Sequence, residues 1–126
     1  MPKIEYRDMH EKYSRYLNIN REIDSKRYAI YTYTQLSDKI KSADDKVNLL
    51  EREIEALKNE QSDLLEVMLA DFQLVGSTNI YQVLVYLYVD GLSWDQISKK
   101  TGYVSKYLMQ LRNKGLLKIK KVLTNS

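Results

Sequence analysis

The chain has 126 residues, of which 44% are apolar and 29% are charged, and its formal net charge is +3. It contains no Cys, one His, one Pro, four Gly and 11 Tyr. These counts exclude a disulfide framework, a Cys-ligated zinc or iron–sulfur site, a His-rich metal site and the glycine-rich phosphate loops GxxxxGKS/T and GxGxxG. We therefore expect neither a metal nor a cofactor.

The apolar residues do not form a membrane-spanning segment. The longest apolar run, Val83 to Val89, is far shorter than the ~20 residues that cross a bilayer. The N-terminal Met1-Pro2-Lys3 is not followed by the apolar region of a secretory signal. We expect a soluble cytoplasmic protein with one domain, or with one small domain and an extended element.

The small net charge is the sum of two halves of opposite sign. Residues 1–90 carry 12 basic and 16 acidic side chains, whereas residues 91–126 carry eight basic side chains and one acidic side chain, Asp95. A basic block joined to a mildly acidic one suggests a polyanion-binding segment on a different kind of scaffold. A merely solvated basic surface is the alternative interpretation.

The N-terminal part of the chain favours long helices. From Lys3 to Val75 it contains neither Gly nor Pro, and good helix formers predominate. From Leu36 onward, residues spaced alternately by four and three positions are apolar in nine of ten cases, which is the heptad pattern of a coiled coil. A helix packed on a globular core would carry a wider apolar face. This heptad stripe comprises Leu36, Ile40, Ala43, Val47, Leu50, Ile54, Leu57, Gln61, Leu64 and Met68.

We expect the heptad stripe to join two chains in a homodimer. Gln61 would cost stability in that interface and could fix the register or the number of helices. The expected oligomerisation residues are Leu36, Ile40, Val47, Leu50, Ile54, Leu57 and Leu64.

The segment before the stripe is also predicted to be helical, although its pattern is less regular. We predict a break within residues 33–37, with Ser37 as a candidate N-cap, and a second candidate break within residues 42–45. The two helices could form an antiparallel hairpin or one continuous rod. The apolar positions of this segment are Met9, Tyr13, Tyr16, Ile23 and Ile30, interrupted by Asn20 and Arg27.

Three tyrosines crowd the end of this first helical segment. The simplest interpretation of Tyr28, Tyr31 and Tyr33 is that their amphipathic rings cover the coiled-coil interface. A platform on which nucleic-acid bases stack is the alternative.

The first segment that favours a break between helices is Val75 to Asn79. Gly76 is suited to a helix C-terminal cap, and Ser77, Thr78 or Asn79 can cap the next helix. We place a domain boundary here. It separates a helical, coiled-coil oligomerisation region at residues 1–75 from a DNA-binding domain at residues 76–126.

The C-terminal domain has the pattern of a helix-turn-helix. An apolar helix is predicted from residue 80 to Gly91, and Ser93 with Gln96 forms a capping box that opens a short helix, Trp94 to Lys100. Gly102 suits the left-handed conformation of a tight turn, and a third, basic helix begins near Val104 or Ser105. A short helix, a turn with Gly and a longer basic helix predict an all-α helix-turn-helix domain.

In this motif the second helix enters the major groove. Asn and Gln can bind adenine through two hydrogen bonds, and Lys can bind guanine or phosphate. Ser105 could cap the helix or contact a phosphate. The residues expected to contact DNA on these grounds are Lys99, Ser105, Lys106, Tyr107, Gln110, Asn113, Lys114 and Lys118.

The stretch Tyr88 to Tyr103, YVDGLSWDQISKKTGY, resembles the GLSWEEIAxxxGYS helix-turn-helix of sigma-factor region four. The layout resembles the RinA, ArpU and LtrC-like late-transcription activators of Gram-positive phages and mobile elements. The similarity is strong over residues 80–114 and only architectural over residues 1–75.

This resemblance implies binding at a late promoter, contact with host RNA polymerase and a place in the host bacterial cytoplasm. It also implies that Met109 belongs to the recognition helix. Two residues depart from the family pattern and weaken that helix: Val104 replaces the usual Ser N-cap, and Gly115 replaces a helix-favouring Ala.

Two further functions are compatible with these patterns. One is an interaction protein that binds a phage regulator or host polymerase without reading DNA and docks through residues 36–71. The other is a ring-forming packaging subunit, but such subunits usually place the helix-turn-helix before the oligomerising helices, the reverse of the order here.

Enzyme activity is the poorest candidate. His10 lies among Asp8, Glu11 and Lys12 on a helix face expected to be solvated. Acid/base chemistry by paired carboxylates needs burial to separate their pKa values, and the acidic pairs of the heptad region are expected to face solvent. Tyr86, Tyr88 and Tyr103 are expected to form a core around Trp94.

Overall fold

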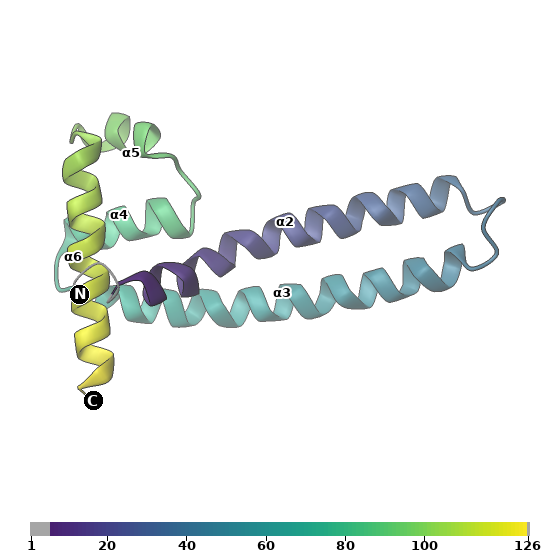
Figure 1. Ribbon diagram of the computed structural model, residues 1–126, viewed down its shortest axis with the longest axis horizontal. Helices are drawn as coiled ribbons and strands as arrows, with labels where there is room; N and C mark the ends of the chain where they lie inside the picture. Colours follow the sequence, from purple (N-terminus) through teal and green to yellow (C-terminus); the bar gives the residue numbers. More distant parts are fainter. Residues whose placement is uncertain (1–5, 126) are drawn as a thin grey trace. The chain divides into compact units, whose positions relative to one another are not determined.

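The computed structural model describes residues 6–125, and every regular element in that range is an α-helix (Figure 1). The all-α class predicted from the sequence is therefore confirmed. The helices are α2 (Arg7–Gln35), α3 (Ala43–Gln73), α4 (Thr78–Tyr88), α5 (Trp94–Thr101) and α6 (Ser105–Thr124).

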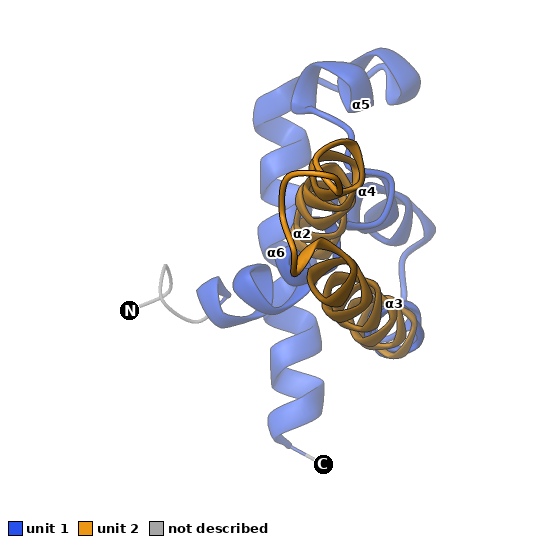
Figure 2. Ribbon diagram, turned by 90° about the vertical axis from the view of Figure 1, so that its right-hand side faces the viewer, with its two compact units in different colours: residues 1–17, 64–126 blue, residues 18–63 orange. Residues whose placement is uncertain are grey.

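The chain divides into two compact units (Figure 2). Unit 1 contains residues 1–17 and 64–126, and unit 2 contains residues 18–63. The boundary predicted at residues 75 and 76 coincides with the turn between α3 and α4. Packing nevertheless crosses that turn, because Met9, Tyr13 and Phe72 belong to one apolar core with residues of α4, α5 and α6.

Unit 2 is an antiparallel helical hairpin, in which the parts of α2 and α3 that it contains lie side by side (Figures 1 and 2). Ile19 and Ile23 are buried against Ile54. Ile30 and Leu57 are half-buried beside them. The hairpin is therefore the correct one of the two arrangements that the sequence left open.

Two polar contacts join the helices of this hairpin. The Gln61 side-chain amide donates to Asn20 Oδ1 at 2.6 Å, and Lys26 Nζ lies 2.8 Å from Glu53 Oε2. Asn20 interrupts the apolar pattern of α2, and Gln61 interrupts that of α3. The two interruptions meet, and their side chains form a solvent-exposed hydrogen bond between the two helices.

Two details of the predicted N-terminal region are wrong. Residues 36–42 form the turn between α2 and α3, so Leu36 and Ile40 are not in a helix and Ser37 is not the N-cap of α3. Tyr28 and Tyr31 are 71% and 60% exposed in the single chain, and Tyr33 is half-buried, so their role in covering a coiled-coil interface stays a prediction. A heptad pattern continues across a turn when loop residues happen to be apolar, which is why periodicity placed the helix start too early.

Unit 1 is built around α4, α5 and α6. Leu84, Ile97 and Leu108 are fully buried where the three helices meet. The Tyr13 ring packs edge-on against Phe72, with ring centroids 4.9 Å apart, and its hydroxyl donates to the buried Asp71 at 2.7 Å. Burial and this hydrogen bond raise the pKa of the Tyr13 hydroxyl, so it remains a donor.

The prediction that Tyr86, Tyr88 and Tyr103 form a core around Trp94 is wrong about which residues form the core. Tyr88 is buried, but it packs near Tyr13 and Phe72, whereas Tyr103 is exposed and contacts Tyr107. The reason is that the N-terminal part of α2 supplies aromatic side chains to this core, and local spacing along residues 76–126 cannot reveal that supply.

Gly115, which sequence patterns did not explain, lies in the interior of α6 and is buried. A Cβ atom at this position would lie 2.6 Å from Ile80 Cγ2 and 3.3 Å from Leu84 Cδ1. The missing side chain therefore allows α4 and α6 to approach closely, and α6 continues through Gly115 to Thr124.

Candidate nucleic-acid interface

The short helix α5 begins and ends as its residue types predict. Gln96 N–H donates to Ser93 Oγ at 3.1 Å, and Ser93 N–H donates to Gln96 Oε1 at 2.8 Å, which completes the capping box. Gly102 follows with φ +80°, a left-handed conformation that glycine adopts without strain. The Ser98 hydroxyl donates to the Tyr103 carbonyl at 2.5 Å and ties the turn to α5.

The start of α6 is less well stabilised. Val104 occupies the N-cap position, and no side chain caps the helix. Ser105 is the first helical residue, so the alternative in which it serves as the N-cap is wrong. The first N–H groups of α6 consequently lack the side-chain acceptor that helix starts usually have.

One face of α6 is fixed in the core of unit 1. Leu108, Leu111, Leu116 and Ile119 are buried there, and α6 packs against both α4 and α5. Because α6 has 3.6 residues per turn, this packing determines which side chains point outward.

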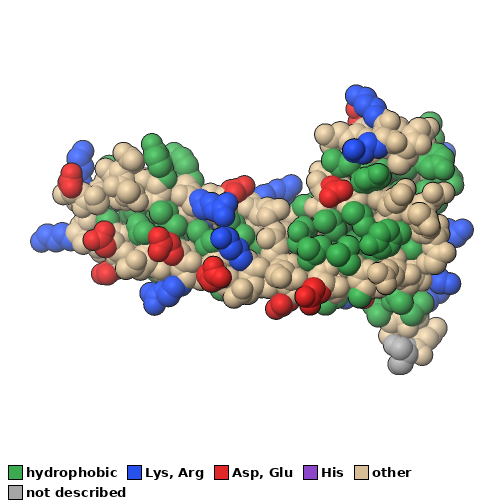
Figure 3. Space-filling view, turned by 180° about the vertical axis from the view of Figure 1, so that it is seen from behind, with side chains coloured by type: hydrophobic (Ala, Val, Ile, Leu, Met, Phe, Trp, Pro, Cys, Tyr) green, Lys and Arg blue, Asp and Glu red, His purple; other side chains and the backbone are tan. Residues whose placement is uncertain are grey.

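Most residues predicted to contact DNA lie on the outward side of α6. Lys106, Gln110, Lys114 and Lys118 are exposed, and so are Tyr107 and Met109. Asn113 and Ser105 are half-buried. On the face seen in Figure 3, Lys and Arg side chains of unit 1 lie along its right-hand edge.

Lys99, the remaining predicted contact, lies on α5 rather than on α6. Its ammonium group is 3.2 Å from Asp95, and both side chains are largely exposed. By contrast, Lys106, Lys114 and Lys118 have no ion pair with a described residue. Among residues 91–125, the exposed lysines without an ion pair to a described residue lie on α6, apart from Lys100, whose ammonium group lies 5.8 Å from the Tyr86 ring centroid.

Arg112 holds a central position that sequence patterns did not single out. Its guanidinium lies over the Trp94 ring at 5.3 Å and over the Tyr6 ring at 5.7 Å, and its Nε donates to Asn113 Oδ1 at 2.6 Å. Arg112 therefore links α6, the start of α5 and the N-terminal segment. The signal available in the sequence was its spacing of four residues from both Leu108 and Leu116, but its partners Trp94 and Tyr6 are distant in sequence.

His10 is half-buried, and the prediction that it is a solvated surface residue is wrong. Its Nδ1 lies 2.6 Å from the Tyr88 hydroxyl and 3.5 Å from Arg112 Nη1. Burial and, second, the Arg112 charge lower the pKa of His10, against a smaller opposing effect of Glu11. Burial raises the pKa of the Tyr88 hydroxyl. An Arg112 guanidinium can only donate, so its approach to His10 Nδ1 favours the tautomer in which Nδ1 is an acceptor and the Tyr88 hydroxyl donates.

The chain matches no protein-family model, and comparisons with curated proteins and with solved structures also give no match. Within residues 6–125, none of the helices combines the length and apolar character needed to cross a membrane. In the same range, no group of three or more His, Cys, Asp or Glu side chains is arranged to hold a metal ion.

Proposed function

We propose that this protein is a sequence-specific DNA-binding transcription regulator whose reading element is α6. The observation that carries the proposal is the two-sided character of this helix. Its apolar face is buried against α4 and α5, whereas Lys106, Gln110 and Lys114 are exposed on the other side. An anchored helix with exposed amide and ammonium groups suits the major groove, which is about 12 Å wide.

The arrangement proposed for residues 78–124 is a three-helix unit with a helix-turn-helix formed by α5 and α6. The short α5, the left-handed Gly102 and the packing of both helices on α4 support it. The resemblance of Tyr88 to Tyr103 to the helix-turn-helix of sigma-factor region four supports it independently. In this arrangement α5 crosses the DNA backbone and α6 contacts base edges.

The side chains of α6 that we expect to contact DNA have different roles in the proposed complex. Gln110 offers both a donor and an acceptor, the pattern that recognises adenine. Asn113 Oδ1 already accepts from Arg112, so its amide group offers N–H donors to base or phosphate acceptors. Lys106 and Lys114 neutralise phosphates, which provides affinity and register.

Selection of bound duplexes from a random pool, followed by affinity measurements on the recovered sequence, tests the proposal. Lys106→Ala and Gln110→Ala should each weaken binding to the selected duplex by about 1–3 kcal/mol. Lys39→Ala is the control, because Lys39 is an exposed residue of the turn in unit 2. Equal binding to all duplexes would contradict sequence-specific recognition.

The further proposal is a late-gene activator of a phage or mobile element that acts with host RNA polymerase, and it rests on the resemblance alone. A homodimer held by a coiled coil remains part of the proposal, because two copies of α6 suit an operator with two half-sites. Ile54 and Leu57 already pack on α2 of the same chain. The apolar side chains that remain available to a second copy of the chain include Leu49, which is half exposed on α3.

A second function is favoured by the exposed tyrosines of unit 2. The Tyr28 and Tyr31 ring centroids are 6.3 Å apart, and both rings are mostly exposed. Exposed aromatic pairs are common in protein interfaces. In this second candidate the protein binds a phage regulator or host polymerase without DNA. Recovery of such a partner from infected host extract, lost in Tyr28→Ala/Tyr31→Ala, would support it over DNA binding.

A further inference from the structure

A pocket of about 340 Å³ lies beside the C-terminal half of α6. Val75 and Ile80, which are both buried, and Leu117 form its apolar part, and Lys114, Lys118 and Lys121 complete its lining. Within residues 6–125, no acidic side chain lines the pocket. The volume is near the lower end of the range for ligand pockets, which suits one or two apolar side chains rather than a whole small molecule.

The shape of this pocket follows from Gly115. Because a Cβ atom there would meet Ile80 and would lie 3.6 Å from Val75 Cγ1, the glycine allows the start of α4 and the turn that follows α3 to pack against α6. Val75 and Ile80, which form the apolar floor of the pocket, are part of the core of unit 1. Leu117 is half-buried, and Lys114, Lys118 and Lys121 are exposed on α6.

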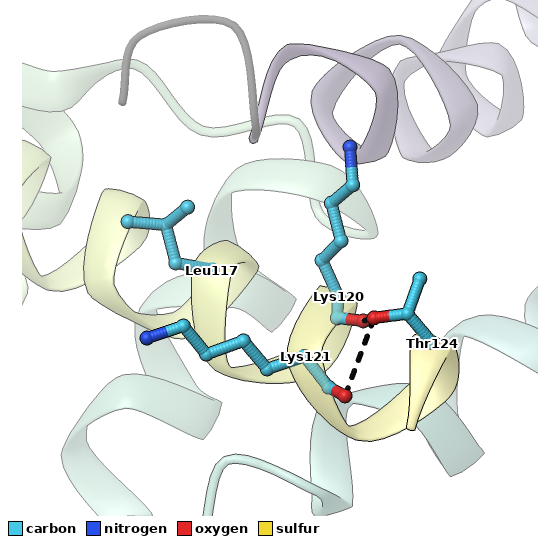
Figure 4. Close-up of a pocket in the computed structure, with 4 residues that line it drawn as sticks. All are labelled: Leu117, Lys120, Lys121 and Thr124. Atoms are coloured by element: carbon cyan, nitrogen blue, oxygen red, sulfur yellow. Dashed lines mark hydrogen bonds between the residues drawn. The ribbon is translucent and has the colours of Figure 1, made fainter. Parts of the chain in front are cut away.

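A second, smaller hollow of about 160 Å³ shares Leu117 and Lys121 and is completed by Lys120 and Thr124 (Figure 4). In this view Lys120 points away from Leu117 and Lys121. Its ammonium group lies 3.1 Å from Asp8 Oδ2. The three lysines of the larger pocket differ, because none of them has an ion pair with a described residue.

We propose that this pocket is a docking site for an acidic segment of a partner protein. The partner inserts an apolar side chain between Val75, Ile80 and Leu117, and its carboxylates pair with Lys114, Lys118 and Lys121. Charge complementarity selects an acidic partner, and the apolar floor distinguishes the site from a DNA phosphate contact, which needs no such floor. This docking goes beyond the proposed DNA binding, although Lys114 and Lys118 border both surfaces.

Fluorescence anisotropy of the full chain with a short labelled peptide tests the proposal. In the probe peptide one Phe is flanked on both sides by Glu residues. One comparison peptide carries Ala in place of Phe, and another carries Gln in place of every Glu. We expect saturable binding of the probe and at least about tenfold weaker binding of both comparison peptides, because each lacks one of the two contacts.

Variants assign the binding to the pocket. Leu117→Asp changes a half-buried side chain, and Lys118→Gln/Lys121→Gln changes two exposed ones. Circular dichroism should show the helices intact in both variants, and each variant should weaken probe binding by about tenfold or more. Lys106→Gln is the matched control, because Lys106 is an exposed lysine of α6 outside the pocket. Binding of the Ala peptide as tight as that of the probe, unchanged binding by Leu117→Asp, or an equal loss in Lys106→Gln would overturn the proposal.

Failure of this proposal and failure of DNA binding are distinguishable. A duplex titration of the same Leu117→Asp protein should retain the affinity that depends on Lys106 and Gln110. If Leu117→Asp abolishes duplex binding but retains probe binding, the pocket belongs to the nucleic-acid interface and the docking proposal is wrong.

Discussion

At the scale of single residues, Gly115 shows how a locally unfavourable residue can be required by packing. Glycine costs about 1 kcal/mol relative to alanine within a helix, so sequence reasoning identified it only as a weakness of α6. The close approach of Ile80, at 2.6 Å from an added Cβ, supplies the missing explanation. Helix propensity is a local quantity, and the contact that overrides it joins α4 to α6.

Gly115→Ala should therefore destabilise the protein, although alanine is the better helix former. The branch methyl of Ile80 cannot move without displacing α4, so overpacking should exceed the propensity gain, with a net loss of about 1–2 kcal/mol in unfolding free energy. Ile80→Leu removes the branch methyl, and the double variant should recover part of the loss. Stabilisation by Gly115→Ala alone in urea unfolding would contradict this packing.

His10 should give the protein a stability that depends on pH. Because burial and Arg112 lower its pKa below the ordinary value of 6.5, the unfolded chain binds more protons than the folded chain just below that value. Stability is then fully present above about pH 6.5 and decreases as the pH falls toward the folded-state pKa. His10→Gln should show a smaller decrease between about pH 7 and pH 5 in urea unfolding, and an identical decrease would contradict the assigned contacts.

At the scale of elements, the features that depend on a few neighbouring residues were predicted correctly from the sequence. The capping box of Ser93 and Gln96, the left-handed Gly102 and the helical region near residues 80–88 are all present. These features depend on hydrogen bonds and steric limits inside one turn, which the local sequence determines. The placement of His10 and Arg112 depends on residues about a hundred positions apart, so no local pattern could reveal it.

The prediction made from the heptad stripe was only partly correct, because periodicity is a local pattern and does not identify long-range partners. Periodicity correctly identified apolar positions of α3 such as Ile54 and Met68, which are buried. It could not identify what covers them, because the stripe of a hairpin and that of a dimer obey the same spacing. The structure places Ile19 and Ile23 of the same chain against Ile54.

The start of α6 should accept a stabilising substitution. Val104 is 69% exposed at the N-cap position and has no capping side chain, so Val104→Ser adds an acceptor for a free N–H with little loss of apolar burial. We expect a gain of about 1 kcal/mol in unfolding free energy. Val104→Ala lacks the acceptor and should show no gain. Equal stability of the Ser and Ala variants would indicate that the N–H groups are already satisfied.

At the scale of the whole molecule, the homodimer remains a prediction. Sedimentation equilibrium should give twice the chain mass of 14.9 kDa. Leu50→Asp should reduce it to one chain mass, because a carboxylate in an apolar interface is costly. Asn59→Asp, at an exposed position of α3, controls for added charge. A wild-type mass of one chain would show that the stripe serves only the hairpin.

The charge distribution of the whole chain favours DNA binding by α6. Most of the basic side chains in residues 91–126 are lysines of α6. Several of these lysines are exposed and have no ion pair with a described residue. Phosphate neutralisation makes affinity fall steeply with salt, with a slope of about −0.9 for each phosphate contacted.

DNA binding by α6 is tested by the salt dependence of duplex affinity in the wild-type chain, in Lys106→Gln and in the unit 2 control Lys58→Gln. If α6 binds DNA, we expect steep salt dependence for the wild type, a slope smaller by about one for Lys106→Gln, and an unchanged slope for Lys58→Gln. Salt-independent affinity of the wild type, or an identical slope for Lys106→Gln, would contradict it.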